Sequence, residues 1–196
     1  DLIKFSMEGE RYVSGSYHAD NVAPIILGGI SLVRSTDKID VVKLPSPKDL
    51  EVIIVRPNIE IKTSDSRKVV KKKVKIEKMV KQSANLGSFI SSLYTGDFNL
   101  MSRSVIDEVV EPDRALLIPE FDKVKEISKK NGCIAVGISG SGPSIFSLSN
   151  NRISSTKILD SISNHYEKLG ISYDGFISKI NSQGIKILDT KWNMLA

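Results

Sequence analysis

Hydrophobic positions recur at helical spacing in the middle of the chain. From about Lys75 to Tyr94, apolar residues fall at steps of three and four, which predicts a long amphipathic helix with an apolar packed face. That face would consist of Ile76, Met79, Val80, Ala84, Gly87, Ile90 and Tyr94. Other patterns predict helices over residues 1–9 (ended by Gly9), 22–27, 96–109, 121–130 and 158–169.

Short β-branched runs predict the strands. Residues 29–33 and 40–44 suggest a hairpin, and residues 51–56 have the continuous apolar character of a central strand. Further strands are expected at 133–138, 144–148, 175–180 and 185–188. Pro45-Ser46-Pro47 is the predicted domain boundary. After it, the order strand, helices, hairpin, helix, strand predicts an α+β fold, a two-layer sandwich, and not a doubly wound nucleotide fold.

Composition narrows the class of protein. The 196 residues are 40% hydrophobic and 26% charged, which is typical of a globular protein. No apolar run approaches the length of a membrane span, so we expect no membrane association. One cysteine excludes an internal disulfide and a cysteine-rich metal site, and two distant histidines argue against a histidine-based zinc site. An intracellular protein fits best.

The net charge of +5 comes largely from lysine, with a local block from Lys68 to Lys75. A nucleic-acid-binding protein can have such a block. However, no aromatic residue interleaves with these lysines, and lysine-rich runs are more often solvated surfaces. We therefore expect no nucleic acid as a partner.

Polar side chains that could bind a ligand or take part in a reaction are concentrated in residues 15–24. His18, Asp20 and Asn21 lie within four residues, between a Gly-Ser turn and a short apolar run. Buried polar groups each need a partner, so such a cluster is unusual for packing alone. Asp20 or Asn21 would also serve as the cap of a helix starting at Val22 or Ala23. The two interpretations are compatible, because a helix N-terminus suits an anionic ligand.

A glycine-rich turn covers residues 139–143, Ser-Gly-Ser-Gly-Pro. It offers backbone N–H groups and hydroxyls that a ligand can approach closely. A glycine hairpin needs no function, however, and this turn matches neither a Walker loop nor a dinucleotide fingerprint. Taken singly, Arg67 and Arg114 are as well explained by surface ion pairs, and Glu10 alone means little.

Together, the segments form an ordered set of motifs. Gly-Ser-x-His-x-Asp-Asn-x-Ala-Pro starts at residue 15 and is followed by Leu-Gly-Gly; Thr-x-x-x-Arg spans 63–67, Glu-Pro-x-Arg spans 111–114, and Gly-Ile-Ser-Gly-Ser-Gly-Pro-Ser spans 137–144. In this order they closely resemble the homoserine kinase family of the GHMP kinase superfamily, over essentially the whole chain. The Gly-Ser-Gly-Pro turn is common to the superfamily, whereas the histidine-containing stretch points to the homoserine branch.

The resemblance implies two domains. Residues 1–46 would be the C-terminal part of a ribosomal-S5-like N-terminal kinase domain, and residues 47–196 a ferredoxin-like, two-layer C-terminal domain. The family's nucleotide loop, a Gly-Ser-Ser-Ala stretch, lies upstream of these motifs and is not among the 196 residues. The chain also starts without methionine. We expect it to be the back part of a longer protein and to be inactive by itself.

The resemblance further implies ATP-dependent phosphorylation of the side-chain hydroxyl of L-homoserine, giving O-phospho-L-homoserine in threonine biosynthesis, in the cytoplasm. ATP, Mg²⁺ and L-homoserine would be the ligands, and a homodimer the assembly. Arg67 and Arg114 would bind the substrate carboxylate, for which the guanidinium fork is well shaped. Asp20, together with His18, would bind the ammonium group, and Asn21 would hold the hydroxyl.

Five further positions match the family's nucleotide and metal site. Glu10 corresponds to its magnesium-binding glutamate. Thr63 corresponds to a hydroxyl near the transferred phosphate, and is equally well explained as a helix N-cap. Gly140, Ser141 and Gly142 would close over the phosphates or help to position the substrate.

Two mechanisms remain open, because phosphoryl transfer depends more on alignment than on a strong base. Asp20 would act as general base in one. In the other, which the resemblance favours, the hydroxyl attacks directly while Asn21 and Glu10-bound magnesium stabilise charge. Two alternative functions also remain: a GHMP kinase acting on mevalonate or a sugar, and a non-catalytic small-molecule-binding module.

Overall fold

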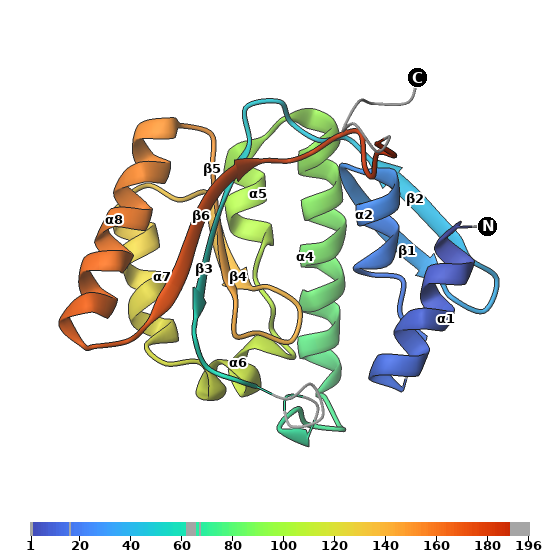
Figure 1. Ribbon diagram of the computed structural model, residues 1–196, viewed down its shortest axis with the longest axis horizontal. Coiled ribbons are helices and arrows are strands. Elements are labelled where there is room, and N and C mark those ends of the chain that lie inside the picture. Colours follow the sequence, from blue (N-terminus) through green and yellow to red (C-terminus); the bar gives the residue numbers. More distant parts are fainter. Residues whose placement is uncertain (1, 16, 62–65, 67, 189–196) are drawn as a thin grey trace. The chain divides into compact units, whose positions relative to one another are not determined.

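The computed structural model describes residues 2–15, 17–61, 66 and 68–188, and the chain in it divides into two compact units (Figure 1). The first combines the chain up to Ser46 with the chain after Lys179, and the second is Pro47–Lys179. The first boundary between the units, after Ser46, falls within the Pro45-Ser46-Pro47 segment. The second boundary, after Lys179, places the residues from Ile180 onward in the first unit, whereas the expected second domain extends to Ala196.

The first unit contains two helices and a hairpin. Its elements are α1 (Leu2–Ser14), α2 (Val22–Leu27), β1 (Ile30–Ser35) and β2 (Asp40–Leu44), and the strands pair antiparallel. Helix α1 runs through Gly9, so the prediction that Gly9 ends it is wrong; the left-handed residue is Gly15, with φ of 73°. A helical glycine costs only about 1 kcal/mol relative to alanine. Burial of Met7 against Ala19 and Ala23 outweighs that cost.

After residue 179 the chain returns to this unit, where residues 181–184 contact the end of α2 at Gly28 and Gly29. The Gly29 amide donates to the Asn181 carbonyl at 2.7 Å, and Lys43 Nζ donates to the carbonyls of Leu27 and Ser182. A Cβ on Gly28 would lie 2.3 Å from the Gly184 nitrogen. Apart from one bridge at Leu188, the strand predicted over 185–188 is absent; the hydrogen bonds that hold the returning chain come from residues 181 and 182, before the predicted strand.

The second unit is built on a four-stranded antiparallel sheet in the order β4-β5-β3-β6. The strands are β3 (Glu51–Pro57), β4 (Ala135–Ile138), β5 (Ile145–Ser149) and β6 (Tyr173–Lys179). The β-branched run at 51–56 therefore occupies a central strand, as predicted, with alternate residues Ile53 and Val55 buried.

Two helices, α7 (Phe121–Lys130) and α8 (Arg152–Lys168), pack on one face of this sheet (Figure 1). Helix α8 carries Ile158, Ile162 and Tyr166, all almost completely buried against the strands. The predicted α+β class is confirmed, and the amphipathic patterns of both helices correctly identified their packed faces.

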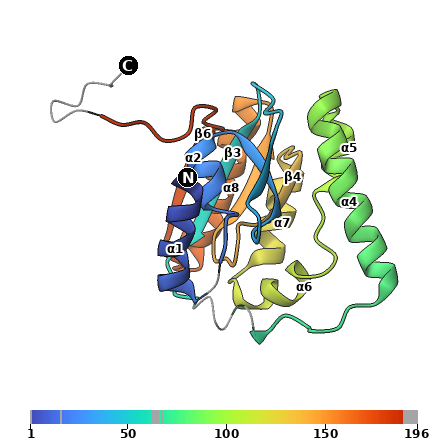
Figure 2. The ribbon, with the colours of Figure 1, turned by 90° about the vertical axis from the view of Figure 1, so that its right-hand side faces the viewer.

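The opposite face of the sheet meets a helical hairpin, α4 (Ile76–Thr95) and α5 (Phe98–Ser104), beyond β4 and β5 (Figure 2). The long helix was predicted correctly, but its predicted packed face is wrong. Ile76, Val80 and Tyr94 are 70%, 62% and 63% exposed. The side turned towards the unit carries Phe89, the buried Leu93, and polar residues that hydrogen-bond the loop after α5.

The described part of the second unit also contains two short segments after α5, α6 (Glu111–Arg114) and the 3₁₀ turn η1 (Ala115–Leu117). Among the residues that the structure describes, no helix combines the length and the apolar character that crossing a membrane requires.

Candidate functional site

A single aspartate organises the loop that precedes α6. The Asp107 carboxylate accepts hydrogen bonds from the amides of Val109, Val110 and Glu111, at 2.8, 2.9 and 3.1 Å. These amides would otherwise be left without partners where a helix begins. The cap fixes the start of the Glu-Pro-x-Arg motif and thereby the direction of its arginine.

Arg114 lies against the glycine turn. Its Nη1 donates to the Gly140 carbonyl at 2.8 Å, and Nε is buried without a hydrogen-bond partner in the described part of the chain. A guanidinium group has five N–H donors, so this single bond leaves most of its capacity unused among the described residues. The structure therefore brings together two of the motifs that the sequence singled out.

The glycine turn itself has a shape that only glycine accommodates easily. Gly140 and Gly142 have φ angles of 60° and 79°. A Cβ on Gly142 would also lie 2.9 Å from the Ile118 side chain. The buried Ser66 hydroxyl donates to the Ser141 carbonyl at 2.9 Å and braces the turn from outside.

A carboxylate lies against β4, the strand that leads into this turn. Glu111 is only 9% exposed and forms an ion pair with Lys125 of α7. Its Oε2 lies 3.2 Å from where a Cβ on Gly137 would be, so the glycine at that position leaves room for the carboxylate. A buried carboxylate is tolerated where it is paired, and the Lys125 ammonium provides that pairing.

A second buried carboxylate, Asp113, anchors the lysine-rich segment. It accepts a hydrogen bond from the Lys71 amide at 3.1 Å, and Lys71 Nζ lies 3.5 Å from its other oxygen. The backbone hydrogen bond from Lys71, assisted by the charge of the same residue, lowers the pKa of Asp113 below its ordinary value of 3.8.

Replacing Asp113 with asparagine should reduce stability at neutral pH, and the deficit should disappear in acid. A carboxyl whose folded pKa is depressed contributes stability above its unfolded pKa, about 3.9, and loses it as pH falls through the folded value. Urea unfolding between pH 2.5 and 7 measures this, with Asp160→Asn, at an exposed position of α8, as control. A deficit for Asp113→Asn that stays constant down to pH 2.5 would show that the carboxylate charge is not responsible.

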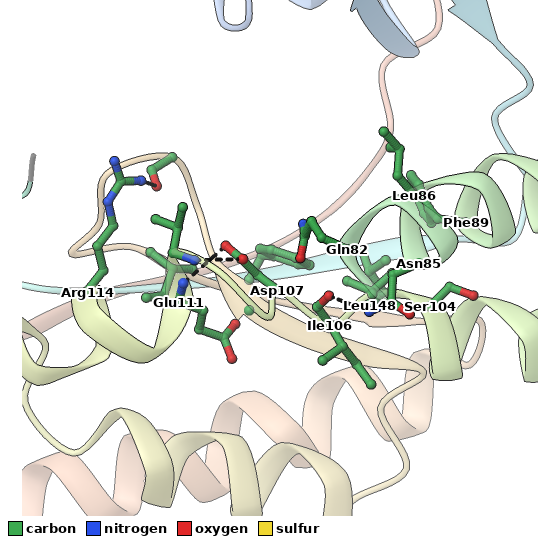
Figure 3. Close-up of a pocket in the computed structure, with 16 residues that line it drawn as sticks. Gln82, Asn85, Leu86, Phe89, Ser104, Ile106, Asp107, Glu111, Arg114 and Leu148 are labelled. Carbon is green, nitrogen blue, oxygen red and sulfur yellow. Dashed lines mark hydrogen bonds between the residues drawn. The ribbon is translucent and has the colours of Figure 1, made fainter. Parts of the chain in front are cut away.

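A cavity of about 290 Å³ opens beside Arg114, between α4 and the sheet (Figure 3). Arg114, Glu111 and Gly140 line one end, and the rest combines apolar side chains such as Phe89 with polar ones such as Gln82. Its wall is held by α4: the Asn85 amide donates to the Ile106 carbonyl, and Gln82 Oε1 accepts from the Glu108 amide. This mixture of an apolar body and a few polar groups is typical of small-molecule sites.

The predicted substrate loop belongs to the first unit. In the residues that lead into α2, the small apolar side chains of Ala19 and Ala23 are buried, while the polar side chains of Asp20 and Asn21 between them are exposed. His18 is half-buried, and its Nδ1 lies 4.0 Å from the Asp20 carboxylate. Asn21 occupies the N-cap position but its side chain makes no capping bond. Capping by Asn21 therefore does not explain this part of the motif.

Glu10 lies half-buried on α1. No group of three or more His, Cys, Asp or Glu side chains suited to a metal ion occurs among the described residues. Mg²⁺ is commonly held by only one or two carboxylates together with phosphate oxygens and waters. A single carboxylate at Glu10 fits that mode of binding, with the remaining ligands coming from a nucleotide.

Two predicted site residues, Thr63 and Arg67, lie outside the described residues. Asn21 and Asp20 belong to the first unit and Arg114 to the second. The convergence of these residues on one ligand stays a prediction.

Sequence reasoning missed several residues that support the site. Asp107 had a readable signal, since an aspartate side chain commonly accepts hydrogen bonds from the backbone amides two or three residues after it in a turn. Lys125 and Ser66 had none, because each reaches its partner across a separation of 14 or 75 residues.

Comparison with known proteins agrees with these motifs. Residues 89–168 match the family described as GHMP kinases C terminal. Homoserine kinases from Chlorobium phaeobacteroides and Chlorobaculum tepidum are 38% and 36% identical over 96% and 97% of this chain. A crystal structure of homoserine kinase from Cytophaga hutchinsonii is 43% identical, with a TM-score of 0.91 over 94% of this chain.

The matches cover the known proteins only in part. The chain spans 59% of the length of the Chlorobium and Chlorobaculum proteins and 58% of the Cytophaga structure. Within that span, identity and fold agree along nearly the whole chain. Residues 89–168 thus match the C-terminal family of GHMP kinases, within a sequence that is similar to homoserine kinases along nearly its whole length.

Proposed function

We propose that this chain provides the substrate-binding part of an ATP-dependent kinase that phosphorylates the side-chain hydroxyl of L-homoserine. The observation that carries the proposal is the position of Arg114 at the polar end of a cavity. Arg114 donates one hydrogen bond to the Gly140 carbonyl, and most of its other N–H donors are not used by the described residues. Relatives and a solved structure that carry the name homoserine kinase support the same substrate.

The ligand's functional groups match the side chains available. Homoserine has a carboxylate, an ammonium group and a hydroxyl on a four-carbon skeleton. Arg114, with Arg67, binds the carboxylate, since the guanidinium fork can donate two parallel bonds to it. Asp20 and His18 take the ammonium group, and the exposed Asn21 side chain holds the attacking hydroxyl.

The glycine turn suits the phosphates. Among the described residues, the amides of Gly140 and Ser141 have no backbone acceptor, whereas the Gly142 amide donates to Ser139 at 3.0 Å. Free amides in a left-handed turn form a concave anion site. Thr63 adds a hydroxyl, and Glu10 holds Mg²⁺, which when bound neutralises phosphate charge.

Transfer then requires alignment more than covalent help. Asn21 fixes the hydroxyl in line with the terminal phosphate, and the amides of the turn stabilise charge that develops on the transferred group. Direct attack is our preferred mechanism, with Asp20 orienting the substrate instead of removing its proton. A cytoplasmic location, a homodimer and the lack of a nucleic-acid partner belong to the same proposal.

A substrate panel tests the proposal on the longest protein that carries this sequence. With ATP and Mg²⁺, we expect O-phosphohomoserine from L-homoserine and no product from mevalonate or galactose, as followed by ³¹P NMR. The 196-residue chain alone should give no turnover, because it lacks the family's nucleotide loop. Turnover of mevalonate or a sugar in place of homoserine would assign another GHMP kinase, and homoserine binding without turnover would assign a binding module.

A further inference from the structure

Three segments that lie far apart in the sequence are joined by a closed ring of hydrogen bonds around Arg114. Its bonds join Ser66 to Ser141, Arg114 to Gly140 and Lys71 to Asp113, at 2.9, 2.8 and 3.1 Å. They span 75, 26 and 42 residues of the sequence. We call this arrangement the Arg114 ring. All of its members belong to the second unit.

The ring closes because its bonds end on neighbouring residues. Two of them end on the adjacent carbonyls of Gly140 and Ser141 in the glycine turn, and two end on the adjacent residues Asp113 and Arg114 of α6. The third side is the 66–71 segment, of which the structure describes all but residue 67. The same short segment therefore holds both the turn and α6.

Ser66 braces the acceptor of the arginine. The peptide group between Ser141 and Gly142 is planar and is held at both ends. Its carbonyl accepts from the buried Ser66 hydroxyl, and its amide donates within the turn at 3.0 Å. The neighbouring carbonyl, on Gly140, is the acceptor of Arg114. Because glycine permits many backbone conformations, this external brace restricts where that carbonyl can lie.

Asp113 braces the donor. It directly precedes Arg114 in α6, a helix of only four residues with few hydrogen bonds of its own. Its buried carboxylate accepts from the Lys71 amide, so a backbone group anchors it. The Lys71 ammonium lies 3.5 Å away, but its side chain is 78% exposed, and water weakens such an ion pair. The backbone bond thus fixes the main chain from which Arg114 extends.

Bracing of this kind favours binding by a long side chain. A free arginine has many rotamers and loses that freedom when a ligand fixes it, which weakens binding. Arg114 is already held at one end, and its Nε is buried without a hydrogen-bond partner among the described residues. A guanidinium group directed in advance can bind an anion at a smaller entropic cost.

We propose that Ser66 and Asp113 are positioning residues, which hold Arg114 in the direction that receives the substrate carboxylate. Ser66 fixes the acceptor of the arginine, and Asp113 fixes its backbone. The identity of the ligand rests on the proposed function, whereas the bracing of Arg114 does not.

NMR measurement of hydrogen exchange at Arg114 Nε, in the longest protein that carries this sequence, tests the bracing. Ser66→Ala and Asp113→Ala should each raise the exchange rate at least tenfold, while the amides of β3 stay protected. Asp113→Asn retains an oxygen for the Lys71 amide and should raise the rate less than Asp113→Ala. The matched control, Lys72→Gln, removes an exposed charge outside the ring and should stay within twofold.

An unchanged rate in Ser66→Ala and in Asp113→Ala would overturn the bracing. If Asp113→Ala loses the protection of β3, Ser66→Ala decides, because it removes only one hydroxyl.

A double-mutant cycle in the same protein tests the positioning role. Ser66→Ala should lower kcat/KM for L-homoserine about tenfold in the unaltered protein. In an Arg114→Gln background the loss should be below twofold, because the guanidinium group that Ser66 directs is already gone. Asp113→Ala should behave in the same way. Equal losses in both backgrounds would assign Ser66 and Asp113 to general stability and would overturn the positioning role.

The two measurements separate this inference from the proposed function. An unaltered protein that does not phosphorylate L-homoserine would contradict the proposed function, and the exchange rate at Arg114 Nε would still decide whether the ring braces the arginine.

Discussion

Replacing Gly28 with alanine should destabilise the first unit by about 3 kcal/mol or more. Gly28 has φ of 69° and ψ of 166°, a backbone conformation that is essentially restricted to glycine. The added Cβ would also lie 2.3, 2.7 and 2.8 Å from backbone atoms of Gly184, Ser182 and Gln183. Because those are main-chain atoms, relief requires movement of the whole returning segment.

Hydrogen exchange at the Gly29 amide is the sharpest measurement, since this amide donates to the Asn181 carbonyl. We expect its protection to be lost in Gly28→Ala, together with a lower urea midpoint. Gly9→Ala is the matched control: it is the same chemical change in α1, where a Cβ meets nothing within 4 Å. That variant should be more stable than the unaltered chain by up to about 1 kcal/mol. Unchanged protection of the Gly29 amide would show that Gly28 and Gly29 do not hold the end of α2 against the returning segment.

Replacing Arg114 with glutamine should lower kcat/KM for L-homoserine about 100-fold in the longest protein that carries this sequence. The change removes the charge-assisted bonds that we propose Arg114 makes to the substrate carboxylate, each worth roughly 1.5–3 kcal/mol. Arg114→Lys keeps the charge but loses the fork, and we expect about a tenfold loss. Steady-state kinetics with saturating ATP measures both effects. Arg103→Gln, at an exposed position on α5, is the control and should be unchanged.

The role of Arg114 can be separated from its bond to Gly140 with a substrate analogue. 3-Aminopropan-1-ol retains the hydroxyl and ammonium groups of homoserine but lacks the carboxylate. If Arg114 binds the carboxylate, the unaltered protein and Arg114→Gln should use this analogue equally poorly. An equal loss on both substrates would mean that Arg114 acts by holding the glycine turn, and would contradict the assigned role.

The fold was largely readable from the sequence where local pattern and tertiary packing agree. The continuous β-branched run in β3 predicted a central strand, and the spacing of Ile158, Ile162 and Tyr166 in α8 predicted a buried face; the structure confirms both. In α4, local pattern and tertiary packing conflict. The strongest apolar periodicity of this helix lies on its exposed side, while polar residues such as Asn85 on the other side form hydrogen bonds with the loop after α5. Periodicity identifies an apolar face without naming what covers it. Gly9 misled for a related reason, because a helix tolerates one glycine when its neighbours are buried.

The site was predictable as motifs and only partly as geometry. The resemblance of the ordered motifs to homoserine kinases indicated that Arg114 and the glycine turn matter, and the structure joins them by a hydrogen bond. Their supports were unreadable, since Glu111–Lys125 and Ser66–Ser141 pair residues from separate elements. Only the folded chain shows which of many exposed-looking lysines and serines is involved.

In the sheet of the second unit, β3 lies directly beside β6, with Glu51 paired with Lys179. Because β3 opens this unit and β6 closes it, its entry and exit lie on adjacent strands, and the first unit resumes at residue 180. The second unit is thus an insertion within the sequence of the first, with neighbouring ends that a short linker could join. Circular permutation, or transplantation into another host protein, would therefore leave its sheet uninterrupted.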